Sequence, residues 1–258
     1  MMLSVAIIAR DEARHIGAAL ESVRGLADET LVLLDDRTRD ATAEIARIHG
    51  AQVVIEQWRS FSAQRNRALD LCQGEWVLFL DADERATPEL VTECRAQIAN
   101  TKGQSPVAGY WIPRHNLFFG QAVRGGGWYP DRQLRLLRRN AARYDESRLV
   151  HEVAELTGEA GTLQGHLLHI NIERLDEFWA KQRAYAMEEA QTLYREGRHA
   201  RWRNFVGAPT REFYRRFVQL GGWRDGTLGL LLCGTLAFFE LIKFVHLRGI
   251  SALGGQPQ

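Results

Sequence analysis

The chain has little cysteine and no closely spaced cysteine pair. Its 258 residues include 3 cysteines, Cys72, Cys94 and Cys233, which is an odd number at wide spacing. This pattern excludes a disulfide framework, and the missing Cys-x-x-Cys spacing excludes a zinc knuckle or a redox motif of that kind. We therefore expect reduced, buried cysteines and a protein of the cytoplasm.

The chain also lacks an excess of charge of either sign. Lys and Arg together number 33 and Asp and Glu 32, which gives a formal net charge of +1. A dedicated nucleic-acid-binding protein usually carries a large basic excess, so no nucleic-acid partner is expected. Hydrophobic residues at 45% and charged residues at 25% are ordinary values for a globular chain with a substantial core.

Two common phosphate-binding loops are missing. The sequence holds no Gly-x-x-x-x-Gly-Lys-Ser/Thr loop, and no Gly-x-Gly-x-x-Gly follows the first apolar run. That run, Leu3 to Ala9, is short and ends at once in Arg10, so it predicts a strand rather than a secretory signal. A phosphate ligand would then need a metal ion and basic side chains.

What is present is an alternation of short apolar runs and helical patterns from residue 3 to about 100. It predicts an α/β fold with a mostly parallel sheet covered by helices on both faces. The expected strands are Leu3 to Ala9, Thr30 to Leu34, Gln52 to Ile55 and Trp76 to Leu80. Further strands are expected at Val107 to Pro113 and Gln133 to Leu137, and helices at Leu175 to Gly197 and Thr210 to Leu247.

Acidic residues follow these expected strands, and ligands of such sheets bind beyond the carboxyl ends of the strands. Glu12 follows the first strand and is assigned to the ligand site with Asp35, which follows the second. Asp81 and Asp83 follow the fourth, and an i, i+2 pair on an extended strand points two carboxylates the same way. Such a pair favours a hard cation, Mg²⁺ or Mn²⁺, that also holds phosphate oxygens. The pattern thus predicts a nucleotide-diphosphate ligand.

The sequence resembles the family 2 glycosyltransferases of the GT-A fold, and within them the bacterial branch of lipopolysaccharide-core biosynthesis. The resemblance rests on motifs in one order along about two thirds of the chain, at residues 6–12, 21–23, 35–42, 64–69, 74–84, 128–131 and 150–152. It implies a GT-A domain over residues 1–172 and a helical extension over residues 173–258.

The resemblance also implies a role for each matching residue in binding a nucleotide-sugar donor. Asp35 would accept a hydrogen bond from the base of a UDP-type donor. Asp81 and Asp83 would hold the ribose and the metal that bridges the diphosphate, and Arg65 and Asn66 would face the nucleotide. For Asp35 a turn-forming role, and for Arg65 an exposed helical position, remain the alternatives.

An inverting transfer needs a general base for the acceptor hydroxyl, and Glu152 is the candidate, with Asp131 and Asp145 as second choices. His169 follows the strand-like run Gln164 to Leu168 and is the candidate third metal ligand. A hydrogen-bonded structural histidine is the alternative.

The sequence departs from the family pattern in the second loop and near the first strand. This chain has Asp36 and Arg37 where the family usually has small residues. It has Asp11 where the family usually has Asn, and Ala41 where the family usually has Gly. Arg37 brings a bulky cation beside the expected base pocket, where it would change the nucleotide preference or reach the phosphates.

Aromatic and basic residues gather between residues 205 and 250, a mixture that suits helices in a membrane interface. The apolar run Leu228 to Leu247 is interrupted by Glu240, Lys243 and His246, which argues for peripheral contact rather than a membrane span. The expected location is the cytoplasm, at the inner face of the cytoplasmic membrane. A helical hairpin packed on the α/β domain or on a second copy, as in a homo-oligomer, is the alternative.

The sequence therefore predicts a metal-dependent, inverting glycosyltransferase of hexosyl or heptosyl type. It would move a sugar from a nucleotide-sugar, in particular a UDP-sugar, to a hydroxyl of a bacterial glycan or glycolipid such as the lipopolysaccharide core. A nucleotidyltransferase is an alternative, although the first loop lacks the Gly-rich segment of that class. A catalytically inactive glycan-binding or scaffold protein is a second alternative, which the intact Asp35, Asp81, Asp83 and Glu152 oppose.

Overall fold

The computed structural model describes residues 2–100, 106–147 and 153–253 of the chain. Contacts divide the chain into two compact units. The first comprises Met1–Arg114 and Asp131–His169, and the second comprises His115–Pro130 and Ile170–Gln258. The sequence placed its domain boundary at residues 172 and 173 and gave no sign that residues 115–130 belong with the helices.

The first unit begins with alternating strands and helices that build a parallel sheet in the order β3-β2-β1-β4. The elements are β1 (Leu3–Ala9), α1 (Ile16–Val23), β2 (Glu29–Asp35), α2 (Thr42–Ile48), β3 (Gln52–Glu56), α3 (Phe61–Leu71) and β4 (Trp76–Phe79). These bounds confirm the strands expected from the apolar runs to within a residue or two.

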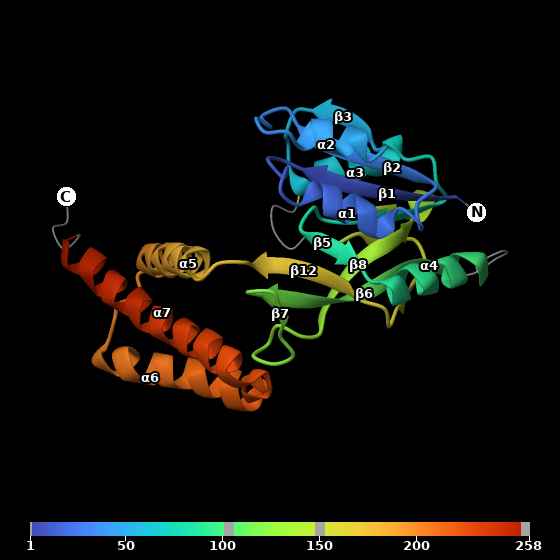
Figure 1. Cartoon of the computed structure of the whole chain (residues 1–258). Helices are drawn as coiled ribbons and strands as arrows, with labels where there is room; N and C mark the ends of the chain where they lie inside the picture. The colour runs from blue at the N-terminus through green and yellow to red at the C-terminus, as the bar shows by residue number, and fades with distance from the viewer. Residues whose placement is uncertain (1, 101–105, 148–152, 254–258) are drawn as a thin grey trace. The chain divides into compact units, whose positions relative to one another are not determined.

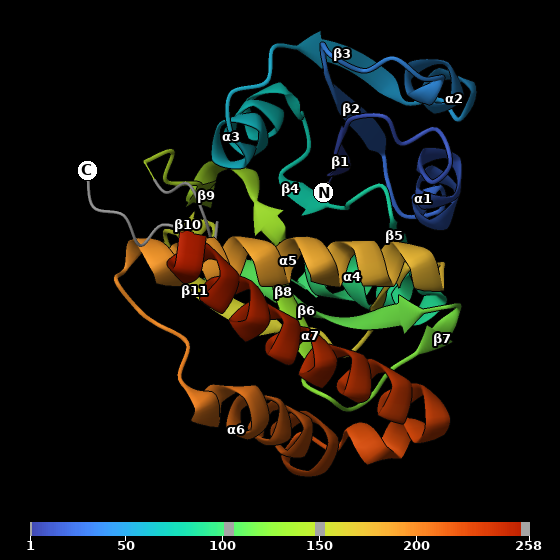
Figure 2. The same ribbon diagram turned by 90° about the vertical axis from the view of Figure 1, so that its left-hand side faces the viewer.

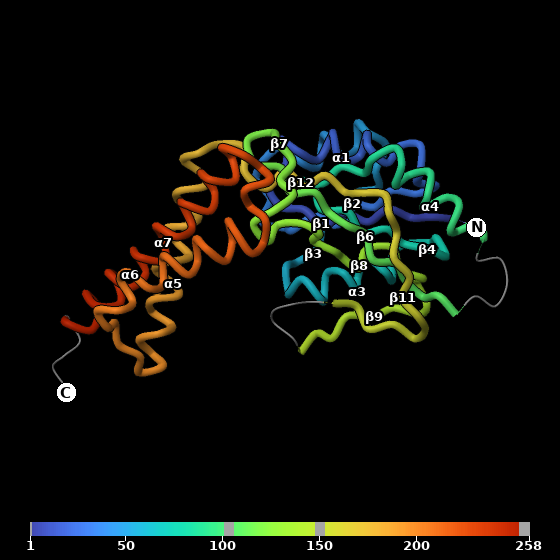
Figure 3. The backbone as a smooth tube through the Cα atoms, turned by 90° about the horizontal axis from the view of Figure 1, so that it is seen from below, coloured from blue at the N-terminus to red at the C-terminus, as the bar shows by residue number. Residues whose placement is uncertain are grey.

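Alternate side chains of the strands pack against helices on opposite faces of this sheet. Val5 and Ile7 of β1 share one apolar cluster with residues of α1 and α2, whereas Ala6 shares a second cluster with Ala68 and Leu69 of α3. Figure 1 shows α1 and α2 in front of the strands, and Figure 3 shows α1 and α4 (Pro88–Asn100) on the side opposite to α3. The helices on both faces confirm the α/β class.

Beyond β4 the sheet continues in antiparallel fashion, so the sheet is mixed and the expectation of a mostly parallel sheet was too simple. β8 (Asp131–Arg138) pairs antiparallel with β4 and with β6 (Val107–Phe118). β12 (Leu167–Ile172) follows in the order and pairs antiparallel with β5 (Glu84–Ala86). Short elements complete the unit: η1 (Arg139–Ala141), β9 (Ala142–Arg143), β10 (Glu155–Leu156) and β11 (Glu159–Thr162).

The second unit is built around helices. It holds β7 (Gln121–Ala122), α5 (Leu175–Arg195), α6 (Trp202–Phe213), the π-helical turn η2 (Tyr214–Gln219), η3 (Gly222–Asp225) and α7 (Gly226–Leu253). α7 packs against both α5 and α6, and Figure 2 shows it crossing α5. Ala190, Ala208 and Leu247, one from each helix, share an apolar cluster. The helical C-terminal extension expected from the sequence is therefore present.

Candidate active site at the carboxyl ends of the strands

The loops that follow β1 and β2 are tied together by hydrogen bonds. The backbone N–H of Glu12 donates to Thr42 Oγ1 at 2.7 Å, and that of Ala13 donates to Asp40 Oδ2 at 2.9 Å. Asp11 Oδ1 accepts from the backbone N–H of Arg39 at 2.8 Å, with a backbone φ of 53° at Asp11. Asn and Asp adopt this left-handed conformation more readily than other non-glycine residues, which explains why Asp can replace the usual Asn here.

The carboxylate of Asp35 at the end of β2 is engaged by Arg37. Arg37 donates from Nε to Oδ1 at 2.9 Å, from NH2 to Oδ2 at 2.6 Å and from its backbone N–H to Oδ1 at 2.9 Å. The Arg37 hydrogen bonds hold the pKa of Asp35 well below its usual range. Asp35 therefore lies where it was predicted, but Arg37 already occupies both oxygens that were expected to meet the base.

Asp81 and Asp83 lie in a turn rather than on an extended strand. β4 ends at Phe79, and the turn is closed by the backbone N–H of Glu84, which donates to the Asp81 carbonyl at 2.9 Å. The alternation of an extended strand therefore does not apply to this pair, and the argument from i, i+2 spacing was wrong for these residues. Their carboxylates have different partners.

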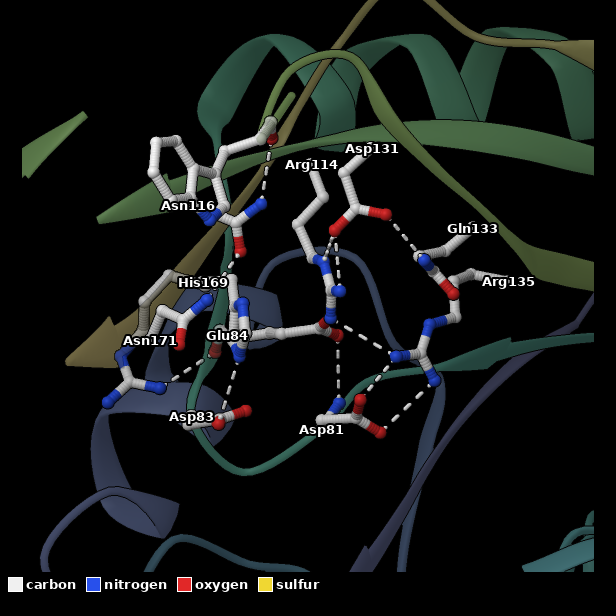
Figure 4. Close-up of polar contacts among 12 residues, drawn as sticks. Asp81, Asp83, Glu84, Arg114, Asn116, Asp131, Gln133, Arg135, His169 and Asn171 are labelled. Atoms are coloured by element: carbon white, nitrogen blue, oxygen red, sulfur yellow. Dashed lines mark hydrogen bonds and ion pairs between the residues drawn. The ribbon is translucent and has the colours of Figure 1, made fainter. Parts of the chain in front are cut away.

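Asp81 belongs to a network of charged groups beside the turn (Figure 4). Arg135 of β8 donates from NH1 to Asp81 Oδ1 at 3.1 Å and from NH2 to Asp81 Oδ2, and its NH2 lies 3.2 Å from Glu84 Oε1. Arg114 also contacts Glu84 Oε1, at 3.0 Å, and continues to Asp131 Oδ2 at 2.8 Å from its Nε. Loss of solvent raises the pKa of Asp81, but the charge and hydrogen bonds of Arg135 outweigh this effect and lower it.

The buried members of this network hold it in place. The Glu84 side chain is 0% exposed and the Arg135 side chain is 4% exposed, so water could not solvate either charge if the other were removed. Breaking a buried ion pair by removing one partner costs about 3–5 kcal/mol, because the other charge is left uncompensated. The position of Asp81 at the strand ends is therefore fixed by its contact with the buried Arg135, which Glu84 holds in turn.

Asp83 has a different partner and lies beside a carboxyl group with a raised pKa. His169 of β12 places Nε2 3.2 Å from Asp83 Oδ2 (Figure 4). Burial, followed by the negative charges of Asp83, Asp40 and Asp81, raises the pKa of Glu12 to about 7. The negative charges at these strand ends are thus only partly balanced by arginines, which is the electrostatic setting that favours a divalent cation.

Arg65 and Asn66, neighbours on α3, have separate surroundings. Arg65 NH2 lies 4.0 Å from Asp81 Oδ1, and its guanidinium lies over the Tyr144 ring at 5.3 Å. Asn66 was expected to face the nucleotide, but its amide donates to the Tyr144 carbonyl at 2.9 Å and accepts from the Tyr144 N–H at 2.9 Å. Asn66 therefore fastens the segment around Tyr144 to α3, whereas Arg65 lies beside the Asp81 turn.

The structure thus brings together only part of the predicted site. Within residues 2–100, 106–147 and 153–253, no three His, Cys, Asp or Glu side chains form a group that could hold a metal ion, so Asp81, Asp83 and His169 are not a preformed ligand trio. Asp83 and His169 are adjacent, and Asp81 faces Arg135. Glu152, the predicted general base, lies outside the described residues.

The sequence assigned no role to Glu84, and it did not single out Arg114 or Arg135. The signal was present for Arg135, since a lone arginine among Leu134, Leu136 and Leu137 in an apolar strand requires a buried partner. Its partner Asp81 lies 54 residues away in the sequence, so the pairing emerges only from the fold.

Comparison of the sequence with known proteins identifies the family of this chain. The family described as Glycosyl transferase family 2 matches residues 4–151. The lipopolysaccharide core biosynthesis glycosyltransferase LpsC of Rhizobium meliloti (strain 1021) is 28% identical over 99% of this chain and 95% of that protein. An uncharacterized glycosyltransferase of Rickettsia prowazekii (strain Madrid E) is 26% identical over 96% of this chain and 87% of that protein.

Solved structures show more distant similarity. S. aureus TarS 1-349 in complex with UDP-GlcNAc is 15% identical over 99% of this chain and 93% of that chain, with a TM-score of 0.48. Glucosyl-3-phosphoglycerate synthase from Mycobacterium tuberculosis, in complex with Mn²⁺, UDP and glucosyl-3-phosphoglycerate, is 19% identical over 76% of this chain and 80% of that chain, with a TM-score of 0.46.

The match over residues 4–151 covers more than half of the 258 residues and includes the strand ends that carry Glu12, Asp35, Asp81 and Asp83. It decides against the nucleotidyltransferase and the scaffold alternatives. The chain therefore belongs to glycosyl transferase family 2, and it is a glycosyltransferase that resembles the lipopolysaccharide-core branch of that family.

Proposed function

We propose that the strand-end site binds a nucleotide-diphosphate sugar, specifically a UDP-sugar, and transfers its sugar with inversion to a hydroxyl of a glycan or glycolipid. The observation that carries this proposal is the turn beyond β4, which holds both Asp81 and Asp83: Arg135 of β8 contacts Asp81, and His169 of β12 lies beside Asp83. A crevice at the carboxyl ends of parallel strands is where α/β proteins bind nucleotides.

Asp35, Asp81 and Arg65 each have a part in donor binding under this proposal. Asp35 would accept a hydrogen bond from the base once Arg37 releases one of its oxygens. Asp81, fixed by Arg135, would hold the ribose, and Arg65 would meet the diphosphate. Arginine suits this role because its charge does not depend on pH and its planar group recognises phosphate oxygens.

Asp83 and His169 are the side chains that fit a divalent cation, since a carboxylate oxygen and an imidazole nitrogen lie 3.2 Å apart beside the raised-pKa carboxyl of Glu12. Mg²⁺ or Mn²⁺ held there would offset the charge that builds on the departing diphosphate. Mg²⁺ usually binds through one or two carboxylates plus substrate phosphates, so two protein ligands suffice.

Glu152 is proposed as the general base. It would take the proton of the acceptor hydroxyl as that oxygen bonds to the anomeric carbon, while the bond from that carbon to the phosphate oxygen breaks and UDP leaves. Attack opposite the leaving phosphate inverts the configuration at the anomeric carbon.

The acceptor is proposed to be a lipid-linked bacterial glycan such as the lipopolysaccharide core, following the name of the Rhizobium meliloti relative. Val206, Trp223 and Leu230 in the second unit are 73%, 57% and 51% exposed, as suits peripheral contact with the inner face of the cytoplasmic membrane. Gly222–Ala252, with mean hydropathy 2.0, is long and apolar enough to cross a membrane, but 39% of its apolar window is buried within the protein. We favour peripheral contact, because Glu240 and Lys243 interrupt this helix.

A thermal-shift screen of nucleotide-sugars, with Mn²⁺ present or removed by EDTA, tests the proposal. A ligand that binds the native state raises the melting temperature. We expect a UDP-sugar to raise it in Mn²⁺ and to lose most of this effect in EDTA or in the Asp83→Asn variant. No shift with any nucleotide-sugar in Mn²⁺ contradicts the proposal.

A further inference from the structure

The second unit contains an open cavity of about 600 Å³, lined largely by its helices. One face of α5 lines it through Phe178, Lys181, Tyr185 and Glu189, which recur at helical spacing. Side chains of α6, η2 and α7 also line it, as do Phe118, Trp128, Asn171 and Ile172. In Figure 2, α7 lies next to α6. The volume lies in the range of pockets that hold small ligands.

The wall of this cavity is polar. Seven of its seventeen lining residues are charged, among them Glu189, Glu212 and Lys243. An acyl chain would leave these charges without water and without new partners, at a high cost in free energy. A ligand rich in hydroxyl groups replaces the lost water with hydrogen bonds.

Most of the charged groups are already held in fixed positions by ion pairs. Lys243 contacts Glu240 and lies 2.9 Å from Glu189 Oε2, which links α7 to α5. Glu212 contacts Arg216 and lies 2.7 Å from Arg215 NH2. A wall arranged in this way needs little reorganisation when a ligand enters, which lowers the cost of binding.

Lys181 differs from the other lining cations, because no carboxylate within the described part of the chain forms an ion pair with it. Its Nζ donates to Asn171 Oδ1 at 3.3 Å. Asn171 in turn donates to Asn116 Oδ1 at 3.2 Å, and Asn116 donates to the Trp128 carbonyl at 2.9 Å. The ammonium group is thus positioned at the cavity with its charge available for an anionic group.

Tyr185 adds an aromatic surface one helical turn from Lys181. Its side chain is 49% exposed although it lines the cavity. Aromatic rings stack on the C–H face of a sugar ring, while the neighbouring charged groups bond to its hydroxyls. A ring next to a cation therefore suits a sugar that carries a negative charge.

We propose that this cavity binds an acidic saccharide segment of the acceptor glycan, recognised by Tyr185 through its ring and by Lys181 through a phosphate or carboxylate group. The proposal rests on the glycosyltransferase function proposed above and adds a second ligand site, in a unit distinct from the one that holds the donor site.

Binding of deacylated lipopolysaccharide core oligosaccharide to the full-length protein tests the proposal, measured by isothermal titration calorimetry. We expect Lys181→Ala and Tyr185→Ala each to weaken binding about tenfold, the loss expected for one charged hydrogen bond or one stacked ring. Arg183→Ala removes an exposed charge of α5 that does not line the cavity and is the matched control. Tyr185→Phe keeps the ring and is expected to bind as the wild type does.

Two modified probes identify the anionic group. Weaker binding of the dephosphorylated oligosaccharide assigns a phosphate, and weaker binding of the carboxyl-reduced oligosaccharide assigns a carboxylate. Equal binding of every probe by wild type and Lys181→Ala overturns the proposal, as does a wild type that binds no probe while UDP-sugars still raise its melting temperature. Failure of the donor screen itself contradicts the proposed function instead, so the two failures are distinguishable.

Discussion

At the scale of single residues, Arg37 engages both carboxylate oxygens of Asp35, the residue proposed to bind the donor base. Asp35 was predicted from its place after an apolar run, and the structure confirms that place at the end of β2. The three hydrogen bonds from Arg37 were not predictable, because the sequence shows two neighbouring charges but not the loop conformation that turns Arg37 back.

Arg37→Ser is expected to strengthen UDP binding about threefold to tenfold. The substitution frees both Asp35 oxygens, so the base no longer competes with a charged hydrogen bond. Isothermal titration calorimetry with UDP measures the change, and Arg39→Ser, which removes an exposed arginine side chain of the same loop, serves as control. Weaker UDP binding by Arg37→Ser would show that Arg37 itself holds the ligand.

The raised pKa of Glu12 predicts a pH dependence of stability. Its pKa is about 7 in the folded protein, compared with the ordinary value of 4.5 expected in the unfolded chain. Burial raises it most, followed by the negative charges of Asp83, Asp40 and Asp81. Between these values the unfolded chain has lost this proton and the folded chain keeps it, so the free energy of unfolding falls as the pH rises from 4.5 to 7.

Urea unfolding of wild type and Glu12→Gln at several pH values, in EDTA, measures this contribution. We expect the difference in unfolding free energy between the two proteins to change steadily from pH 4.5 to 7 and to level off above pH 7. A difference that stays constant over this interval contradicts the assignment.

At the scale of secondary structure, the parallel half of the sheet was predictable and the antiparallel half was not. β1, β2 and β4 are mostly buried apolar runs, because both of their faces are covered by helices, whereas the edge strand β3 is only partly buried. β12 reads Leu-Leu-His-Ile-Asn-Ile and is only partly buried along most of its length, so its pattern is weak and His169 was placed after the strand instead of within it. The turn at Asp81 and Asp83 was misjudged because β4 ends two residues before Asp81.

Gly74, just before β4, is required by close packing between strands. A Cβ atom at this position would lie 2.6 Å from the backbone nitrogen of Ser4 in β1. Gly74→Ala therefore has to shift a backbone, and we expect it to lower the free energy of unfolding by about 1–3 kcal/mol. Gly25, whose Cβ would meet nothing within 4 Å, is the matched site, and Gly25→Ala should change stability by less than about 0.5 kcal/mol. Equal midpoints in urea for the two variants would contradict this packing argument.

At the scale of the whole molecule, the near-zero net charge hides two unlike regions. The acidic strand ends lie in the first unit, and exposed aromatic and aliphatic side chains are frequent in the helices of the second. The distribution of acidic, aromatic and basic residues along the sequence predicted two unlike regions. It did not predict the cavity in the second unit, because its walls come from helices far apart in the sequence.

Peripheral membrane contact predicts binding to anionic vesicles. We expect the full-length protein to float with phosphatidylglycerol vesicles at low salt, to bind phosphatidylcholine vesicles weakly, and to lose binding in Trp223→Ser, whose side chain is 57% exposed in the wild type. Ile48→Ser removes an exposed apolar side chain of the first unit and should have no effect. Full binding by Trp223→Ser, or none by the wild type, would exclude this surface as the membrane contact.

The strand-end site around Asp83 is proposed to carry out sugar transfer, and UDP release from a panel of UDP-sugars is the direct test. The assay contains Mn²⁺ and deacylated core oligosaccharide and compares wild type with Asp83→Asn and with Asp70→Asn, an exposed aspartate of α3. We predict that Asp83→Asn, with an unchanged melting temperature, loses on the order of 100-fold in rate, while Asp70→Asn keeps the wild-type rate. Wild-type turnover by Asp83→Asn would contradict the account.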